Sequence, residues 1–284
     1  MKTVKKQIRA ARIFLVDAFT QKVFRGNPAM VCILDKSEDD ELMQKIAFEF
    51  NLSETAFLLP KFDEINKSNE YEIRWFTPLR EMPLCGHATL AASKVLFDYE
   101  KVSSDEIIFH SQSGVLKAKR DACGISMDFP LDEPEEVQPH QYDEILKAMG
   151  VSQYEHIFLG QGTRKLVIRL KSPQEVMDIQ PKFEELKKLR VDGIKGVGIT
   201  SIDNKEYHFI TRYFNPWAGV NEDPVTGSVH TLLAAYWSRI MGIKELKAYQ
   251  ASERGGELLL RIKENNRLEI VGEAKVIFRG EFAL

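Results

Sequence analysis

The sequence predicts an α+β protein in which one structural unit, built of strands and one buried helix, occurs twice along the chain. Two observations support this prediction. A short aromatic–proline motif, followed by a proline–glycine turn, appears once in each half. Each turn is then followed by an amphipathic helix pattern, and the two patterns have the same phase. The rest of the chain is mostly strand-like, with shorter helices.

The two copies of the motif occupy corresponding places in the halves. The aromatic–proline motif spans 75–78 in the first half and 213–216 in the second, and the turns span 83–87 and 224–228. After each turn, apolar residues recur at i, i+3, i+4, i+7, i+8 and i+11, which is one face of a helix. These residues are Ala88, Ala91, Ala92, Val95, Leu96 and Tyr99 in the first half, and Val229, Leu232, Leu233, Tyr236, Trp237 and Ile240 in the second.

The remaining elements follow in order between these helices. A helix is expected over 37–49, with Ser37 as its N-cap residue and an acidic first turn. The segment 130–139 is rich in Pro and Glu and is expected to link two domains, 1–129 and 130–284. Short helices are expected at 143–149, 173–177 and 181–190. Strands are expected at 13–19, 29–34, 56–59, 71–76, 107–109, 115–119, 157–159, 166–170, 198–202, 207–214 and 274–282, the last of which is free to return to the first domain.

Composition narrows the classes of function. Of the 284 residues, 44% are hydrophobic and 29% are charged, and the net charge is −3. Such a balance disfavours nucleic acid and anionic membranes as partners. The N-terminus is basic from Lys2 to Arg9, but the apolar run after it stops at Asp17, so no signal peptide is expected. The widely spaced cysteines Cys32, Cys85 and Cys123 fit reduced thiols in a cytoplasmic protein.

The two turns are the first candidate for a ligand site. A helix N-terminus presents backbone N–H groups and partial positive charge, and glycine allows a ligand to approach closely. Gly86 with His87, and Gly227 with Ser228, are therefore expected to hold a carboxylate at the interface of the halves. The alternative is that both are ordinary helix starts, at which Ser228 merely acts as a cap.

Glu54 is the candidate acid–base group. It follows Ser53 and precedes an apolar stretch that ends at Leu59, so it is expected to be partly removed from water. Partial burial raises the pKa of a carboxyl group towards the range useful for general acid–base catalysis. The alternative is a solvated residue at a strand edge. The corresponding stretch of the second half, 192–199, has no glutamate, so this role is expected in one half only.

Two more polar residues lie at the turns. His87 follows the first glycine, and Asp223 precedes Pro224, which restrains it towards an extended conformation. The alternatives are a structural histidine, and a carboxylate that only complements the helix dipole. No metal site is expected, because the other histidines lack ligand spacing with Cys, Asp or Glu. These histidines are His110, His140, His156, His208 and His230.

At these residues the chain resembles the PhzF-like proteins of phenazine biosynthesis, which are relatives of diaminopimelate epimerase. Four blocks, in the same order and spread over nearly the whole chain, carry the resemblance. They are Asp17–Phe19 with Gly26–Pro28, Asn51–Phe57, Trp75–Pro78 with Pro83–Thr89, and Glu222–Ser228.

The resemblance implies two pseudo-symmetric domains, each a β-barrel-like sheet wrapped around a central helix, and a homodimer. It implies that Glu54 is the acid–base residue and that His87 and Asp223 lie near the substrate. Gly86, His87, Gly227 and Ser228 would bind its carboxylate, and Ser53 is a further candidate for substrate binding. The implied reaction is an isomerisation that moves a proton between carbons of a small, cyclic carboxylic acid without a cofactor, while the particular substrate is not implied.

Two other functions stay open. Epimerases of the related branch use two cysteines, one at each turn, and Cys85 occupies the first position. The second position holds Thr226, whose hydroxyl is far too weak an acid to replace a thiol, so Cys85 is interpreted as a small buried side chain. The other alternative is a non-catalytic small-molecule-binding protein that has kept the fold.

Overall fold

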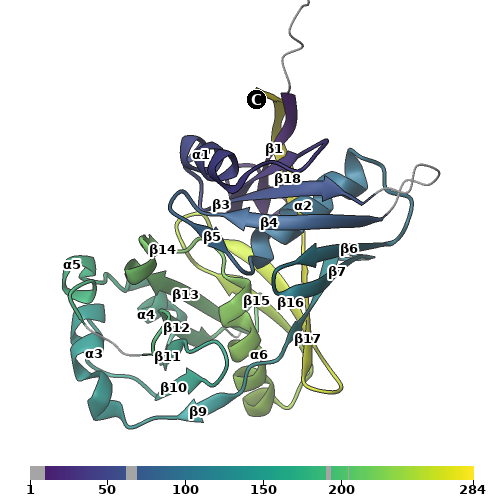
Figure 1. The fold of residues 1–284 in the computed structure, drawn as a ribbon. Helices are drawn as coiled ribbons and strands as arrows, with labels where there is room; N and C mark the ends of the chain where they lie inside the picture. The colour runs from purple at the N-terminus through teal and green to yellow at the C-terminus, as the bar shows by residue number, and fades with distance from the viewer. Residues whose placement is uncertain (1–9, 62–68, 190–192, 204) are drawn as a thin grey trace, which may run out of the picture. The chain divides into compact units, whose positions relative to one another are not determined.

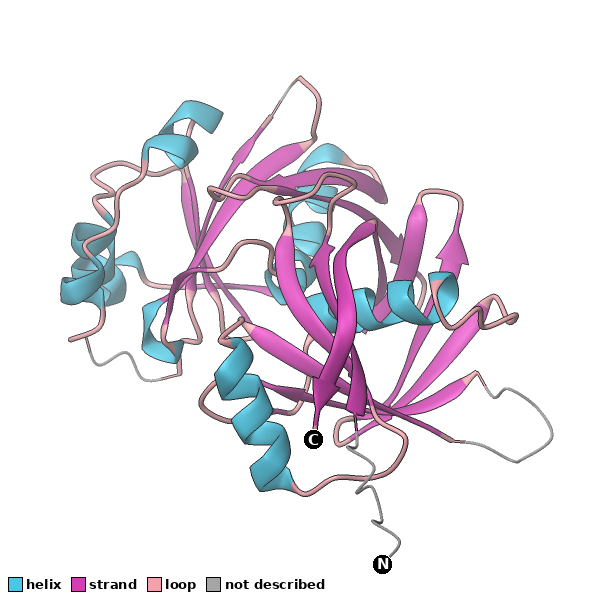
Figure 2. Ribbon diagram, turned by 90° about the horizontal axis from the view of Figure 1, so that it is seen from above, coloured by secondary structure: helices cyan, strands magenta, loops and turns pink. Residues whose placement is uncertain are grey.

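The structure, a computed structural model, describes residues 10–61, 69–189, 193–203 and 205–284. Strands make up most of its regular structure (Figure 2). The basic N-terminal residues up to Arg9, and Arg190 at the end of one predicted helix, lie outside the described residues. Among those that are described, no helix has both the length and the apolar composition needed to span a lipid bilayer.

The chain divides into two compact units. Unit 1 comprises residues 1–23, 28–120 and 274–284, and unit 2 comprises residues 24–27 and 121–273. The chain passes into unit 2 at Asp121, before the predicted boundary at 129/130, because the strand that follows pairs with a strand of unit 2. The last strand, β18, belongs to unit 1 and pairs antiparallel with the first, so β1 and β18 run side by side (Figure 1).

Unit 1 has a mixed sheet and one central helix. Strand β2 pairs parallel with β3, β3 antiparallel with β4, β4 parallel with β6, and β6 antiparallel with β7. Helix α2 packs against β1, β3 and β18 and is buried along most of its length. The elements are β1 (Ala10–Ala18), β2 (Asn27–Ile33), α1 (Asp40–Phe50), β3 (Glu54–Pro60), β4 (Glu70–Phe76), β5 (Glu81–Met82), α2 (Gly86–Asp98), β6 (Glu106–Ser111), β7 (Gly114–Asp121) and β18 (Ala274–Ala283).

Unit 2 has the same order of pairings. Strand β11 pairs parallel with β12, β12 antiparallel with β13, β13 parallel with β15, and β15 antiparallel with β16. Helix α6 packs against β9, β15, β16 and β17. The elements are β8 (Gly124–Pro130), β9 (Pro134–Glu136), α3 (Asp143–Met149), β10 (His156–Gly160), β11 (Leu166–Arg169), α4 (Pro173–Asp178), α5 (Phe183–Leu186), β12 (Val197–Ile202), β13 (Phe209–Asn215), β14 (Val220–Glu222), α6 (Gly227–Met241), β15 (Glu245–Gln250), β16 (Gly256–Lys263) and β17 (Arg267–Gly272), with short 3-10 turns at Pro139–Tyr142 and Pro216–Ala218.

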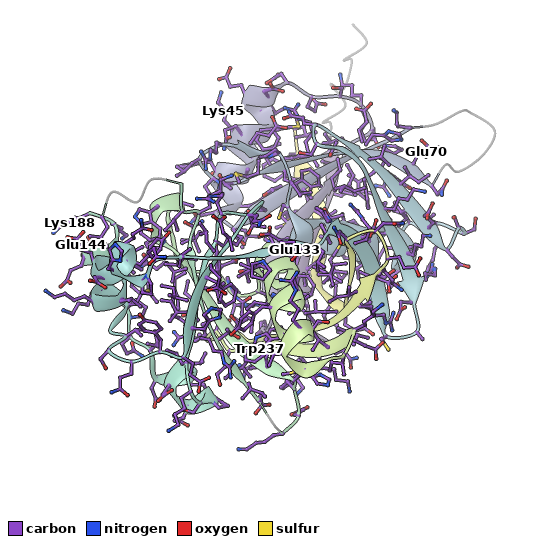
Figure 3. The ribbon with its side chains drawn as sticks, turned by 90° about the horizontal axis from the view of Figure 1, so that it is seen from below. Lys45, Glu70, Glu133, Glu144, Lys188 and Trp237 are labelled. Carbon is purple, nitrogen blue, oxygen red and sulfur yellow. The ribbon has the colours of Figure 1, made fainter. Side chains whose placement is uncertain are left out.

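The two central helices are buried nearly all round, which explains their apolar sequences. Along α6 the side chains from Val229 to Trp237 are buried. Trp237, labelled in Figure 3, is fully buried and donates its indole N–H to Thr200 Oγ1 at 3.1 Å. Burying a large apolar side chain stabilises a fold by about 1.5–3 kcal/mol, so each helix anchors its own unit. The predicted helices after Gly86 and Gly227 are confirmed.

Three local predictions were wrong. The first long helix begins at Asp40, and its N-cap residue is Asp39 rather than Ser37. The carboxylate of Asp39 accepts a hydrogen bond from Leu42 N–H at 2.8 Å. The predicted linker 130–139 contains strand β9, which pairs with β10. The described part of the helix predicted over 181–190 is the single turn Phe183–Leu186.

The turn before each central helix is supported by an arginine–glutamate pair. In unit 1, Arg74 on β4 makes two hydrogen bonds to Glu81 on β5, both of 2.7 Å. In unit 2, Arg212 on β13 makes two hydrogen bonds to Glu222 on β14, of 2.7 and 2.9 Å. Such two-point contacts fix the plane of the guanidinium group and hold the two strands of each turn in register.

Candidate active site

Glu54 is the first residue of β3, at the end of the sheet of unit 1. Its backbone is paired with Ala29 of β2, and its side chain is 17% exposed. The next residues of the strand, Thr55 and Ala56, are fully buried. Ser53 donates its hydroxyl to the carbonyl oxygen of Pro28 at 3.2 Å. The side chain of Glu54 is therefore largely buried at the start of β3, as its apolar neighbours in the sequence indicated.

The N-terminus of α2 brings two more titratable side chains close to Glu54. The N-cap residue Cys85 is extended, and its side chain makes no capping hydrogen bond. His87 lies in the first turn and is 7% exposed. Its Nε2 atom lies 3.2 Å from Glu54 Oε2, within ion-pair distance but without hydrogen-bond geometry. Its Nδ1 atom lies 3.5 Å from Cys85 Sγ.

Charge and burial oppose each other in this cluster. Burial works against a charged His87, but the interactions of His87 with Cys85 and Glu54 outweigh burial and raise the pKa of His87 well above 6.5. Burial, helped by the charge of Glu54, also raises the pKa of Cys85. Because Cys85 then stays a neutral thiol at neutral pH, the carboxylate of Glu54 is the charge that stabilises a protonated His87. Glu54 and His87 therefore form a buried ion pair beside a neutral thiol.

The other three predicted site residues belong to unit 2. Helix α6 begins at Gly227, with Thr226 as its extended N-cap residue, and Ser228 is exposed in the first turn. The carboxylate of Asp223 is held on both oxygens. Oδ1 accepts a hydrogen bond from Asn27 Nδ2 at 2.8 Å, and Oδ2 accepts one from Thr226 Oγ1 at 2.6 Å. Asp223 therefore has a fixed orientation, rather than serving only as a charge near the helix dipole.

Two polar residues of unit 2, Gln250 and Lys165, were missed by the sequence analysis. Gln250 accepts the backbone N–H of Thr226 at 2.8 Å and donates to the carbonyl oxygen of Asp223 at 2.6 Å. Lys165 is 8% exposed and donates to the hydroxyl of Tyr213 at 2.7 Å. Burial lowers the pKa of Lys165 to about 8, against the opposing charge of Asp223. No local pattern marks Gln250 or Lys165, because their partners are distant in sequence.

The cluster of unit 1 also bears on the predicted absence of a metal site. Glu54, Cys85 and His87 each offer one ligand atom, and these atoms all lie within 4.8 Å of one another. The spacing of Cys, His and acidic residues along the sequence did not indicate this group, because Glu54 lies on β3 while Cys85 and His87 lie at the start of α2. A surface hollow of about 450 Å³ lies elsewhere, between Gly150 and Gln180, and none of the predicted site residues lines it. The buried side-chain cluster is the better candidate site, because three titratable side chains converge there and the pKa values of two of them, Cys85 and His87, are shifted.

Comparison with known proteins places these residues in a family. The family model described as phenazine biosynthesis-like protein matches residues 16–280. A phenazine biosynthesis-like domain-containing protein of Bos taurus is 41% identical over 280 residues, which cover 94% of this chain and 97% of the relative. An uncharacterized isomerase of Halalkalibacterium halodurans is 40% identical over 275 residues, covering 96% of this chain and 98% of that protein.

Solved structures agree on the fold. A PhzF-family protein of Enterococcus faecalis has a TM-score of 0.88 at 40% identity, with 97% of this chain and 100% of that chain covered. A hydroxyproline epimerase from Agrobacterium vitis has a TM-score of 0.60 at 12% identity, over 97% of this chain and 93% of that one. This more distant likeness concerns the fold alone, a mixed α/β fold that isomerases and epimerases share. The chain belongs to the phenazine biosynthesis-like PhzC-PhzF family.

Proposed function

We propose that the chain is an isomerase that moves a proton between two carbons of a small, cyclic carboxylic acid. The pairing of Glu54 with His87 at 3.2 Å, in a largely buried place at the N-terminus of α2, is the observation that carries this proposal. A buried carboxylate held by a cation is a suitable proton carrier, because its orientation is fixed before the substrate arrives.

In the proposed reaction, a carboxylate oxygen of Glu54 removes a proton from one carbon. The electron pair of that C–H bond moves into the conjugated system of the substrate, and the carboxyl group of Glu54 returns the proton to another carbon. Atoms and electrons balance within the substrate and the glutamate, so no cofactor takes part.

The N-terminus of α2 has the properties needed for the acid group of the substrate. Its backbone N–H groups at Gly86 and His87 point out of the helix start, and the helix contributes partial positive charge there. These groups bind the carboxylate of the substrate and stabilise enolate-like charge as it develops. Asp223, Gly227 and Ser228 are proposed as substrate-binding residues of unit 2, with the fixed carboxylate of Asp223 accepting from a hydroxyl or amino group.

The epimerase alternative has less support. Burial and the charge of Glu54 raise the pKa of Cys85, which makes its thiol a poor base. In unit 2, Thr226 stands in the corresponding place and donates its hydroxyl to Asp223. An epimerase with two opposed thiols therefore lacks one of its bases and has the other in its unreactive form.

The proposal is tested by hydrogen exchange in heavy water. Wild-type protein is incubated with a library of small cyclic carboxylic acids, and deuterium incorporation at carbon is followed by mass spectrometry. With an acid that exchanges, Glu54→Gln is expected to lower the rate by about 10²–10⁴-fold. Cys85→Ser is expected to change it far less, and Glu49→Gln, an exposed glutamate on α1, serves as the matched control.

Two results count against the proposal. If Cys85→Ser is inactive while Glu54→Gln keeps its rate, the thiol is the proton carrier and the mechanism is wrong. If binding of an acid is measurable by calorimetry but none exchanges, the non-catalytic alternative is correct. Asp223→Asn and Ser228→Ala, measured alongside, are expected to weaken binding of the same acid.

A further inference from the structure

Cys85 takes no part in the proposed proton transfer, yet it is fixed beside the two residues that do. Its Sγ atom lies 3.5 Å from His87 Nδ1, and its backbone carbonyl accepts hydrogen bonds from both the N–H and the hydroxyl of Thr89. Its extended backbone allows the side chains at positions 85 and 87 to converge. The thiol is thus held beside a titratable ring nitrogen and not only among apolar side chains.

We propose that Glu54, Cys85 and His87 form a binding site for a divalent zinc ion, one ligand atom coming from each side chain. The three ligand atoms all lie within 4.8 Å of one another. This assignment rests on their geometry and donor chemistry and is independent of the proposed isomerisation.

The donor set is one that zinc prefers. Thiolate, neutral imidazole and carboxylate are its three protein ligands, and a site with three of them leaves one position open to water. Zinc therefore displaces one proton from the thiol of Cys85 and one from the ring of His87, and both protons pass to solvent. Bond lengths of about 2.0–2.3 Å put the ligands of a tetrahedral zinc ion roughly 3.3–3.7 Å apart. Cys85 Sγ and His87 Nδ1, at 3.5 Å, already have this separation. Glu54 reaches the same ion by rotation of its side chain, since its oxygen is within 4.8 Å of both partners.

A second observation points to a ligand at this place. His87 is more than nine-tenths buried, and its Nε2 atom makes no hydrogen bond, although Glu54 is close to it. Nε2 has Glu54 as its ion-pair partner, but no directed hydrogen bond fixes the two side chains in their present positions. Both are therefore able to serve as ligands of one ion.

Unit 2 provides an internal comparison. At the start of α6, Thr226 occupies the place of Cys85, and Ser228 occupies the place of His87. Neither hydroxyl is a zinc ligand of the usual kind. Among the described residues, the group in unit 1 is the one whose Cys, His and acidic ligand atoms converge.

Zinc bound here would occupy the lone pairs of Glu54. If Glu54 is the proton carrier, which rests on the proposed function, zinc inhibits the enzyme reversibly. The class of ligand is a borderline-soft divalent ion, since a hard cation such as Mg²⁺ does not favour a thiolate.

Cobalt replaces zinc in the experiment, because a thiolate bound to Co²⁺ gives a charge-transfer absorption band in the near ultraviolet. The full-length chain, purified with chelator and then desalted, is titrated with Co²⁺ and afterwards with Zn²⁺, which should displace cobalt and abolish the band. Cys85→Ser should abolish the thiolate band. Glu54→Gln and His87→Gln should each weaken zinc binding, measured by calorimetry, by at least about 10–100-fold.

The other two cysteines supply matched controls. Cys32 is buried on β2, and Cys123 is exposed. Cys32→Ser and Cys123→Ser are expected to keep the band and the zinc affinity. A band that persists in Cys85→Ser, or that is lost in Cys123→Ser, would overturn the assignment, and so would the absence of any band. Circular dichroism of each variant separates loss of binding from loss of fold.

The inhibition is measured separately from the binding. With an acid that exchanges deuterium, added zinc should stop the exchange and a chelator should restore it. Binding without inhibition would keep the metal site and count against Glu54 as the proton carrier. Inhibition without the cobalt band would place the metal elsewhere and overturn the site.

Discussion

The side chains at the start of α2 interact electrostatically with Glu54. Substitution of one of these residues is therefore expected to change the pKa values of the others. The buried ion pair of Glu54 and His87 has a neutral thiol next to it, and the two partners come from β3 and α2. Sequence reasoning found Glu54 and His87, because one lies in an apolar context and the other follows a turn glycine. It interpreted Cys85 as packing alone, since nothing in the local sequence shows that a glutamate from another strand lies nearby.

The protonation of His87 can be measured directly. Because the charge of Glu54 favours its protonated form, His87 should titrate with a pKa well above 6.5 in nuclear magnetic resonance spectra. Glu54→Gln removes that charge and should lower the pKa by about 1–3 units. Glu49→Gln should leave it unchanged. A midpoint for His87 that is the same in wild type and Glu54→Gln would contradict the ion pair.

The pKa of His230, on α6, is shifted in the direction opposite to that of His87. It is fully buried, its Nδ1–H donates to the carbonyl of Thr226 at 2.8 Å, and burial lowers its pKa from 6.5 to about 4. The unfolded chain binds this proton first as the pH falls, so the free energy of unfolding decreases between pH 6.5 and 4, by up to about 3 kcal/mol. Above pH 6.5 this residue has no such effect.

Urea unfolding at several pH values checks this. The loss of stability between pH 7 and pH 4 should be smaller in His230→Gln than in wild type, whatever the variant costs at pH 7. His140→Gln, at an exposed position, should keep the loss seen in wild type. An unchanged pH dependence in His230→Gln would mean that other groups cause the acid sensitivity.

At the scale of elements, the turn before each central helix sets where the helix begins, and an arginine stabilises each turn by bridging its two strands. The two arginines differ in burial. The side chain of Arg212 is 11% exposed and that of Arg74 is 28% exposed. Arg212 also donates to the carbonyl groups of Val176, Met177 and Ile179 at the end of α4, so it joins two elements. Arg74 instead has Asp40, an exposed carboxylate, as its second partner.

The same substitution should therefore have unequal effects at the two positions. Arg212→Met leaves Glu222 and three carbonyl groups without their donor, and should lower the free energy of unfolding by about 3–5 kcal/mol. Arg74→Met removes a partly exposed contact and should cost about 1 kcal/mol. Denaturant unfolding of the two variants gives the comparison. Equal costs, or a larger cost at Arg74, would show that burial does not set the strength of these contacts.

Element boundaries were harder to predict than the elements themselves. The helices after Gly86 and Gly227 could be predicted, because an apolar period continues over several turns and a glycine marks each start. Ser37 was chosen as a cap because it is a good N-cap residue, but the carboxylate of Asp39 takes that role. Strand β9 lies in a Pro- and Glu-rich segment, and its pairing with β10 depends on residues that are distant in sequence.

At the scale of the whole molecule, unit 1 is not continuous in sequence. Its first strand pairs along its length with β18, from Ala10 with Ala283 to Ala18 with Ala274. Helix α2 also packs against β18. The sequence left open whether this strand returns to the first half, because an alternating strand pattern does not identify its partner.

Removal of the strand tests its contribution. In a chain that ends at Glu273, the N–H and C=O groups of β1 that face β18 lose their partners, while its pairing with β2 remains, and one side of α2 is uncovered. Hydrogen exchange should become faster in β1 and α2, while β15 and β16, which pair with each other, keep their protection. Protection of β1 equal to that in the full-length chain would show that β18 contributes little to unit 1.

The pairing of β1 with β18 also has a consequence for the order of events during translation. Every strand of unit 2 leaves the ribosome before β18 does, so unit 2 is able to fold while the sheet of unit 1 still lacks a strand. During that interval β1 presents an unpaired edge to other nascent chains and to chaperones. Slowing the ribosome with rare codons just before Ala274 should prolong the interval and raise the fraction of newly made protein that aggregates, with no change in amino-acid sequence.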